Sequence, residues 1–372
     1  MKKLFIALSI IVFAVACSGD GDGGDGNSTD TFDRAAMLTN WADNIIIPAY
    51  TNYQAKVNAL TASAAAFNAA PTEANLITLR ESWLQAYKAY QHVAMFEIGK
   101  ADELKLLSYA NTYPADAAHI NSNIASGSYN LSLYDEFSSQ GFPGLDYILN
   151  GLANNDADIV AFYSTNTNAA HYKQYLTDLT TRLKTVADAV LADWTSGYRD
   201  TFITGTGTSV SSAVNVMTNN FVKHLEKDVR TPKIDIPAGV LSNGSTFPDK
   251  VEAYYKNNVS KELLNEAVTA SKNFFNGKHF TSETNGPSLK NYLDAVNAVR
   301  DGQKLSDIIN DQYTTVLSTI GALNNSFSQQ ITTDNTKMVA AHDALQKNVV
   351  YIKNDMLQGL NIPIGFVDGD GD

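Results

Sequence analysis

The sequence predicts an all-α protein made of two helical-bundle-like domains packed side by side, with a cleft between them. Apolar residues recur three and four positions apart over most of the 372 residues, which is the spacing of one helical face. Gly- and Pro-containing irregular stretches interrupt this spacing at Gly197–Thr208 and Thr231–Pro248. We place the domain boundary near residue 205, because domains 33–204 and 205–372 are then each large enough for a bundle.

Residues 1–17 have the features of a bacterial lipoprotein signal peptide. Lys2 and Lys3 precede the apolar stretch Leu4–Ala16, which is too short to span a bilayer stably. Small residues stand directly before Cys17, where a lipoprotein peptidase would cut. We expect Cys17 to become a lipidated N-terminus, held by several acyl chains at about 0.8 kcal/mol for each buried CH₂ group. The alternative is that Cys17 is an incidental residue of an ordinary signal peptide.

Residues 18–32 are predicted to be a flexible tether. Ser18–Thr31 contains five Gly and four Asp and no large apolar side chain, so little burial can offset the entropy of ordering it. An acidic run directly after a lipidated Cys resembles the export tags of surface lipoproteins in Bacteroidetes. The expected location is therefore the cell envelope, as an outer-membrane lipoprotein, and the resemblance favours a surface-exposed one.

The helices follow in order along the remaining chain. Two of them are predicted to form a hairpin around Pro71, with Thr72 as the N-cap of the second. Tyr129–Phe137 alternates weakly; we expect a loop there, with a short strand as the alternative. The apolar faces that predict the helices are Tyr50, Tyr53, Val57, Leu60, Ala64 and Phe67; Leu76, Leu79, Trp83, Tyr87, Tyr90 and Ala94; Tyr172, Leu176, Leu179, Leu183, Val186, Val190 and Trp194; Val210, Val214, Met217, Phe221 and Leu225; Leu305, Ile308, Tyr313, Val316, Ile320, Leu323 and Phe327; and Val339, Leu345, Val349, Ile352 and Met356.

Charge and composition exclude several functional classes. The chain has 27 Lys and Arg against 39 Asp and Glu, a net charge of −12, which disfavours nucleic acid as a partner. Cys17 is the only cysteine, so once it is acylated the chain has no disulfide, no Cys nucleophile and no thiolate metal ligand. The sequence contains neither the HExxH pattern of zinc peptidases nor the GxSxG pattern of serine hydrolases.

Gln140–Leu149, with the sequence QGFPGLDYIL, is the segment most suggestive of a site. Pro143 is expected at the first position of a helix, because its missing N–H would lack a partner there anyway. Asp146 would then lie in the first helical turn, near unpaired backbone N–H groups. One interpretation gives Asp146 a functional role; the alternative is that it only complements the helix dipole.

Four segments of the chain stand in a recognisable order: Trp41–Tyr50; Trp83–Tyr87 with Phe96–Gly99; Gly141–Leu149; and Leu360–Ile364 followed by Asp368–Asp372. Together they resemble the imelysin-like family of envelope lipoproteins over roughly residue 33 to the end. The resemblance implies two all-helical, bundle-like domains, an envelope location, a link to iron uptake and a functional site in a cleft at the domain interface. Some members are named as insulin-cleaving metallopeptidases.

The chain departs from the family's GxHxxE pattern. It has Gly141, but Pro143 stands where the pattern has His and Asp146 where it has Glu. Because Pro has no ligand atom, the His/Glu metal pair of the pattern cannot form here. If Asp146 and Glu97 meet in the cleft, with His92 nearby, their oxygen-rich ligation would suit a hard cation or an amine, so iron or another divalent cation is the candidate cofactor. We assign no catalytic residue.

The leading hypothesis is a lipid-anchored, non-catalytic binding or accessory protein in iron or haem acquisition. Its expected partners are the membrane, a metal or haem, and an outer-membrane receptor or another envelope protein. A metallopeptidase with a divergent GxHxxE site is one alternative. A structural docking partner of an outer-membrane receptor is another.

Overall fold

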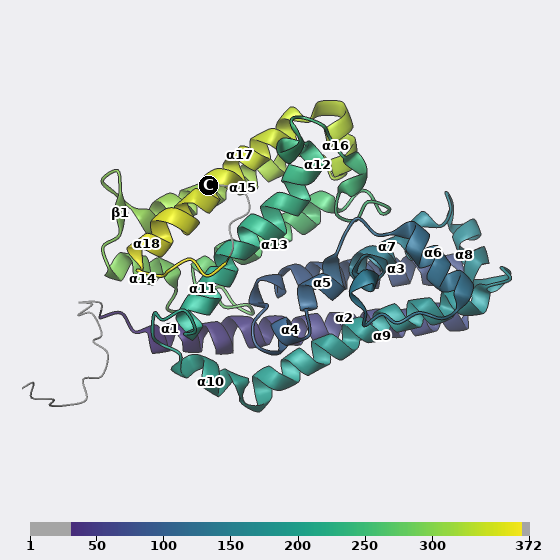
Figure 1. Ribbon diagram of the computed structural model, residues 1–372, viewed down its shortest axis with the longest axis horizontal. Helices are drawn as coiled ribbons and strands as arrows, with labels where there is room; N and C mark the ends of the chain where they lie inside the picture. Colours follow the sequence, from purple (N-terminus) through teal and green to yellow (C-terminus); the bar gives the residue numbers. More distant parts are fainter. Residues whose placement is uncertain (1–30, 367–372) are drawn as a thin grey trace, which may run out of the picture. The chain divides into compact units, whose positions relative to one another are not determined.

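Helices make up nearly all of the regular structure in the computed structural model, which describes residues 31–366 (Figure 1). The only strands among these residues are β1 (Val299–Arg300) and β2 (Gln303–Lys304), which pair antiparallel. The all-α fold class is therefore confirmed. The signal peptide, Cys17, most of the predicted tether and the Asp368–Asp372 ending lie outside the described residues.

Three long helices organise the first half of the chain. Helix α2 (Ile47–Ala69) packs against α3 (Glu73–Gln91) on one side and against α9 (Ala169–Asp193) on another (Figure 1). The predicted hairpin forms at Pro71, and the Thr72 side chain accepts the N–H of Asn75 at 3.2 Å, as expected of an N-cap. The shorter elements of this half are α1 (Arg34–Asn40), η1 (Trp41–Ile46), η2 (Ala94–Phe96), α4 (Lys100–Glu103), α5 (Leu106–Asn111), α6 (Ala117–Ser126), η3 (Tyr134–Ser139), α7 (Gly141–Asp146), η4 (Tyr147–Gly151), α8 (Asp156–Ser164), η5 (Trp194–Tyr198) and α10 (Arg199–Thr204).

In the second half, α15 (Leu305–Gly321) packs against both α13 (Ser260–Phe275) and α17 (Thr336–Val350). The π-helical segment η6 (His224–Asp235) lies against α17 and α13, and α13 also contacts α3 from the first half. The remaining elements are α11 (Ala213–Lys223), α12 (Ile236–Ala238), η7 (Val240–Ser242), η8 (Pro248–Lys250), α14 (Leu289–Ala295), α16 (Phe327–Asp334), η9 (Tyr351–Met356) and α18 (Leu357–Gly359).

Several predicted boundaries were wrong. Val210 was expected on a helical face, but it is 65% exposed and α11 begins only at Ala213. The stretch from Thr231 was expected to be irregular, yet helix continues to Ala238 with Pro232 inside η6. Pro232 thus lies inside a continuous helical segment although it has no backbone N–H to donate. Tyr129–Phe137 contains no strand: the expected loop is confirmed for residues 129–133, and the 3₁₀ segment η3 begins at Tyr134.

Residues from Phe32 onward form one compact unit, so the division at residue 205 stays a prediction. The two halves share contacts near that point, where the Arg34 guanidinium donates to the carbonyl of Thr206 at 3.0 Å. Within residues 31–366, no helix combines the length and apolar character needed to cross a membrane.

Candidate functional site

The segment singled out in the sequence begins a helix two residues earlier than predicted. Helix α7 starts at Gly141, so Pro143 is its third residue rather than its first. Gly141 has a φ of +68°, and a Cβ placed on it would lie 2.3 Å from the carbonyl oxygen of Ala110. Only glycine fits this close backbone approach, which sets α7 against α5.

Aromatic side chains hold α7 against α3. The ring of Phe142 stacks on Tyr87 with centroids 4.5 Å apart and planes 6° apart. The indole N–H of Trp83 donates to the backbone carbonyl of Phe142 at 3.1 Å. Trp83 and Tyr87 are fully buried, so both act as core residues that position this segment.

Asp146 is the last residue of α7 and is only 1% exposed. Its carboxylate accepts the backbone N–H groups of Tyr255 and Lys256, each at 2.9 Å, and the side-chain amide of Asn150 at 3.1 Å. Burial raises the pKa of Asp146 to about 7, although these three donors favour its charged form. Neither the first-turn position nor the dipole role predicted for Asp146 occurs. It joins α7 to a distant loop instead.

Glu97 and His92 have different partners from those of Asp146. The Glu97 carboxylate accepts the N–H of Leu107 at 3.1 Å and lies 3.7 Å from the ammonium of Lys223. Burial raises the pKa of Glu97 to about 7. His92 Nε2 is 2.9 Å from Glu266. Because Asp146 and Glu97 share no partner, their joint ligation of a cation stays a prediction. Among residues 31–366 no three His, Cys, Asp or Glu side chains are grouped so that they could hold a metal ion.

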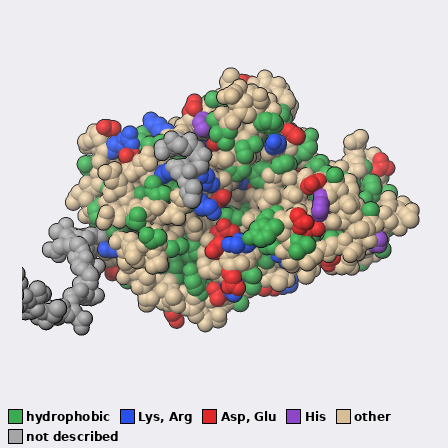
Figure 2. Space-filling view, in the orientation of Figure 1, with side chains coloured by type: hydrophobic (Ala, Val, Ile, Leu, Met, Phe, Trp, Pro, Cys, Tyr) green, Lys and Arg blue, Asp and Glu red, His purple; other side chains and the backbone are tan. Residues whose placement is uncertain are grey.

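A pocket of about 300 Å³, here named the polar pocket, lies between the C-terminal part of α3, α5 and η6. Its walls therefore come from both predicted domains. Lys, Arg, Asp and Glu side chains of both signs gather around the middle of the face shown in Figure 2, although the whole chain is acidic. The lining residues are Tyr90, Gln91, Ala94, Leu107, Ser108, Asn111, Thr112, Tyr113, His224, Lys227, Asp228, Pro232 and Lys233.

Buried charges form one wall of the polar pocket. Lys233 forms an ion pair with Glu252, and both side chains are 2% exposed. Gln91 accepts a hydrogen bond from the Lys233 ammonium at 3.1 Å, and the Asn111 amide donates to Glu252 at 2.9 Å. Burial lowers the pKa of Lys233, and the charge of Glu252 opposes that shift. These contacts fix the pocket wall between η6 and the loop that contains Glu252.

His224 is the polar-pocket residue with the largest unmet hydrogen-bonding capacity. It is 2% exposed, and neither ring nitrogen has a hydrogen-bond partner within the described chain. The Asp228 carboxylate lies 3.6 Å from Nδ1. The hydroxyl of Tyr113 is likewise buried and unpaired, and burial raises its pKa well above the ordinary value. Since buried polar groups are almost always satisfied, these atoms are suited to meet a bound ligand or ordered water.

The sequence analysis missed His224 and Asp228. Their spacing of four residues on a helix was a usable signal, because it places an imidazole and a carboxylate on one face. The sequence analysis considered only His92 among the histidines, and it took the neighbouring stretch from Thr231 as irregular.

Comparisons with known proteins agree on one family. A sequence model of the Imelysin family matches residues 46–354. "Iron-regulated protein A" of Synechococcus elongatus is 21% identical over 335 residues, which are 85% of this chain and 87% of that protein.

Two solved structures are similar to this chain. One is a putative iron-regulated protein A precursor from Parabacteroides distasonis, with a TM-score of 0.69 and 18% identity, covering 87% of this chain and 95% of that one. The other is an imelysin-like protein from Psychrobacter arcticum, with a TM-score of 0.67 and 20% identity. That match covers 90% of this chain and 97% of the other. At these identities the likeness establishes a shared fold.

Proposed function

Because the chain belongs to the imelysin family, we propose that it is a lipid-anchored, non-catalytic envelope protein that binds an iron-containing ligand in the polar pocket. The observation that carries this proposal is His224, whose buried ring nitrogens have no hydrogen-bond partner among residues 31–366. The Asp228 carboxylate lies 3.6 Å from its Nδ1, and Tyr113 lines the same pocket. The name of the Synechococcus relative, iron-regulated protein A, supports a role connected with iron.

The chemistry of the pocket favours a small iron complex over haem. Imidazole nitrogen and carboxylate oxygen both coordinate iron, so His224 and Asp228 supply a partial ligand set. Such a set suits iron that arrives with other ligands already bound. The volume of about 300 Å³ is at the lower end of small-molecule sites, which run from roughly 300 to 1,000 Å³. A macrocycle the size of haem would fill or exceed it.

The metallopeptidase alternative has less support from the residues present. Pro143 offers no ligand atom at the motif's His position, and Asp146 is already engaged by two backbone amides and Asn150. To activate a water molecule, a metal must be held by two or three protein ligands and keep one coordination position open for the water. Peptide cleavage that is sensitive to chelators and lost in Asp146→Ala would nevertheless favour this alternative.

Ferric citrate retention tests the binding proposal. The full-length protein is mixed with ferric citrate, desalted, and its iron measured by metal analysis, with haemin in a parallel series. We expect iron from ferric citrate to be retained by the wild type, and retention to fall about tenfold in His224→Ala and in Asp228→Asn. The control is His119→Gln, a change of a partly exposed histidine outside the polar pocket.

Two results would overturn the proposal. One is the absence of iron and haemin binding together with normal iron uptake by a deletion strain. The other is equal retention by His224→Ala and the wild type, which would place the ligand elsewhere.

The lipid anchor has a separate test. Cys17 has the sequence context of an acylated residue, so labelled palmitate should be incorporated into the wild type and not into Cys17→Ser. Protease treatment of intact cells then distinguishes a surface-exposed protein from a periplasmic one. Equal labelling of both proteins would exclude Cys17 as the anchor.

A further inference from the structure

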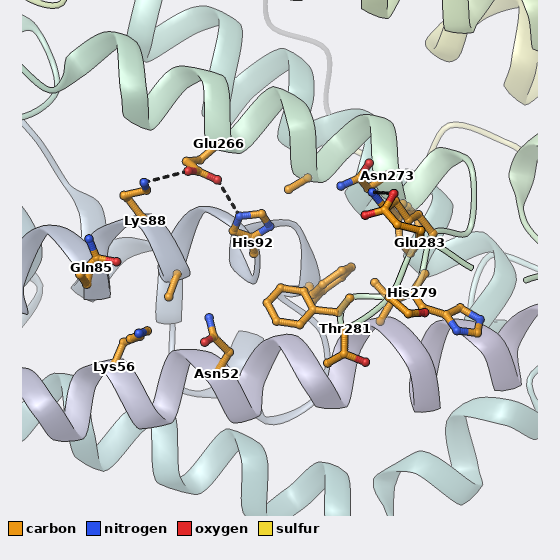
Figure 3. A pocket seen from close by; sticks show the side chains of 18 residues that line it. Asn52, Lys56, Gln85, Lys88, His92, Glu266, Asn273, His279, Thr281 and Glu283 are labelled. Atoms are coloured by element: carbon orange, nitrogen blue, oxygen red, sulfur yellow. Dashed lines mark hydrogen bonds and ion pairs between the residues drawn. The ribbon is translucent and has the colours of Figure 1, made fainter. Parts of the chain in front are cut away.

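A second and larger pocket lies on the other face of α3. It has a volume of about 600 Å³ and is enclosed by α2, α3, α13 and the segment 278–283 (Figure 3). We call it the large pocket. Ala89 of α3 and His92, the residue directly after α3, line it, whereas Tyr90 and Gln91 of α3 line the polar pocket. The two pockets therefore stand back to back across one helix and share no lining residue.

One rim of the large pocket carries hydrogen-bond donors without partners. Asn52 and Lys56 lie one turn apart on α2 and face Gln85 of α3 across the opening (Figure 3). Within the described chain, none of these three side chains has a hydrogen bond or an ion pair. Lys56 therefore brings a positive charge to the pocket that no acidic side chain balances locally.

The acidic residues of the pocket are already paired. Glu266 of α13 lies 3.1 Å from the ammonium of Lys88 and 2.9 Å from His92 Nε2. The hydrogen bond from His92 is the main cause that lowers the pKa of Glu266, so this carboxylate stays charged and occupied. Glu283 pairs with Lys278 at 2.8 Å. The charge left to attract a ligand is therefore that of Lys56.

Aromatic rings form the opposite wall. The Phe280 ring meets His92 edge-on, with centroids 5.6 Å apart and planes at 82°. Phe96 and Phe274, both 1% exposed, contact each other with centroids 5.6 Å apart. Ala270 of α13, at 6% exposure, adds a small apolar side chain to the lining. This wall offers a ring-shaped ligand apolar contact and edge-to-face partners.

We propose that the large pocket binds a small aromatic carboxylate. Its carboxylate pairs with Lys56 and accepts from the Asn52 and Gln85 amides, and its ring lies against Phe280. One unpaired ammonium matches the single charge of a carboxylate, whereas a phosphate monoester, at about −1.5 to −2, would call for further cations. This inference is independent of the proposed iron-binding function.

Fluorine NMR with 4-fluorobenzoate tests the charge assignment on the full-length protein. We expect saturable line broadening with the wild type and a dissociation constant about tenfold higher for Lys56→Met, because a charge-assisted hydrogen bond is lost. Lys56→Arg should keep most of the affinity. Lys337→Met makes the same charge change at an exposed position outside the pocket and should bind as the wild type does.

Related ligands and a variant that narrows the pocket test the assignment without changing Lys56. Phenylacetate should displace 4-fluorobenzoate, acetate should not, and 4-fluorobenzylamine should bind far more weakly. Ala270→Leu should reduce binding because the larger side chain occupies space that the ligand ring would take. Retained helical circular dichroism is the check on folding.

The proposal is overturned by an absence of broadening with the wild type, by equal binding of the benzylamine, or by Lys56→Met binding as tightly as the wild type. His224→Ala and Asp228→Asn lie in the polar pocket and should leave 4-fluorobenzoate binding unchanged. A failure of the iron proposal and a failure of this one are therefore distinguishable.

Discussion

The Asp146 carboxylate accepts the backbone N–H of Tyr255 at 2.9 Å, across a separation of 109 residues in the chain. Its other oxygen accepts the N–H of Lys256 at 2.9 Å. Two consecutive backbone amides of one loop are thus satisfied by a single buried side chain at the end of α7. The acid that stands at the motif's Glu position therefore fixes two distant parts of the chain to each other.

Replacing Asp146 should reduce stability more than an ordinary surface change does. In Asp146→Ala both loop amides lose their acceptor, which we expect to cost about 3 kcal/mol of unfolding free energy in urea titrations. Asp146→Asn keeps one acceptor oxygen and should cost less. Asp135→Ala, at an exposed position, is the control and should stay within about 0.5 kcal/mol of the wild type. Equal losses of unfolding free energy in the two alanine variants would show that the hydrogen bonds to Asp146 contribute nothing to stability.

The long helices could be predicted from the sequence because their stability depends on local periodicity. The face from Tyr50 to Phe67 on α2 is fully or almost fully buried, as its spacing required. Contacts between distant segments were not accessible in this way. Nothing near Asp146 in the sequence indicates that its partners are the amides of Tyr255 and Lys256.

The candidate site was predicted less well than the fold, for a related reason. The spacing around Pro143 suggested a helix start, yet the start is set by Gly141, whose close approach to Ala110 is a tertiary contact. Pro232 suggested a break, but η6 accommodates it and carries His224 into the polar pocket. Pro marks a helix end only as a tendency, and the contacts of η6 with α17 and α13 are tertiary contacts that the local sequence does not show.

Gly141 should not tolerate a side chain. Gly141→Ala would place a methyl group 2.3 Å from the Ala110 carbonyl oxygen and strain a backbone with φ of +68°, so we expect a loss of about 3 kcal/mol or failure to fold. Gly321→Ala is the matched control, since a Cβ at this last residue of α15 meets nothing within 4 Å. It should be neutral or stabilise by up to about 1 kcal/mol. Thermal unfolding of both variants distinguishes the clash from a general effect of removing glycine.

Removing one partner of the buried Lys233–Glu252 ion pair should destabilise the protein more than replacing both partners with uncharged residues. Lys233→Met leaves Glu252 charged at 2% exposure and should cost about 3 to 5 kcal/mol. The double variant Lys233→Met with Glu252→Gln removes the stranded charge, and Gln can still accept from the amides of Gln91 and Asn111. It should therefore recover a large part of that loss. A double-mutant cycle by urea unfolding gives the coupling energy, and a double variant as unstable as the sum of the single ones would contradict this account.

Glu97 should make the protein less stable as the pH rises through the weakly acidic range. Burial raises its pKa from 4.5 to about 7 in the folded protein. Between these values the folded protein keeps a proton that the unfolded chain has already released, so unfolding becomes easier as the pH increases. The full shift corresponds to up to about 3 kcal/mol, reached near pH 7 and absent below about pH 4.5.

The measurement is the unfolding free energy of the wild type and of Glu97→Gln from pH 4 to pH 8. Gln keeps an acceptor for the N–H of Leu107 but does not titrate. The stability of the variant relative to the wild type should therefore increase as the pH rises from about 4.5 to 7. Taking the difference in unfolding free energy between the two proteins cancels the contribution of Asp146, whose pKa is also raised to about 7. The exposed Glu81→Gln is the control for a Glu-to-Gln change and should stay within about 0.5 kcal/mol of the wild type at each pH measured. A flat difference for Glu97→Gln, or one of opposite sign, would mean that Glu97 is ionised throughout and that Lys223 outweighs the effect of burial.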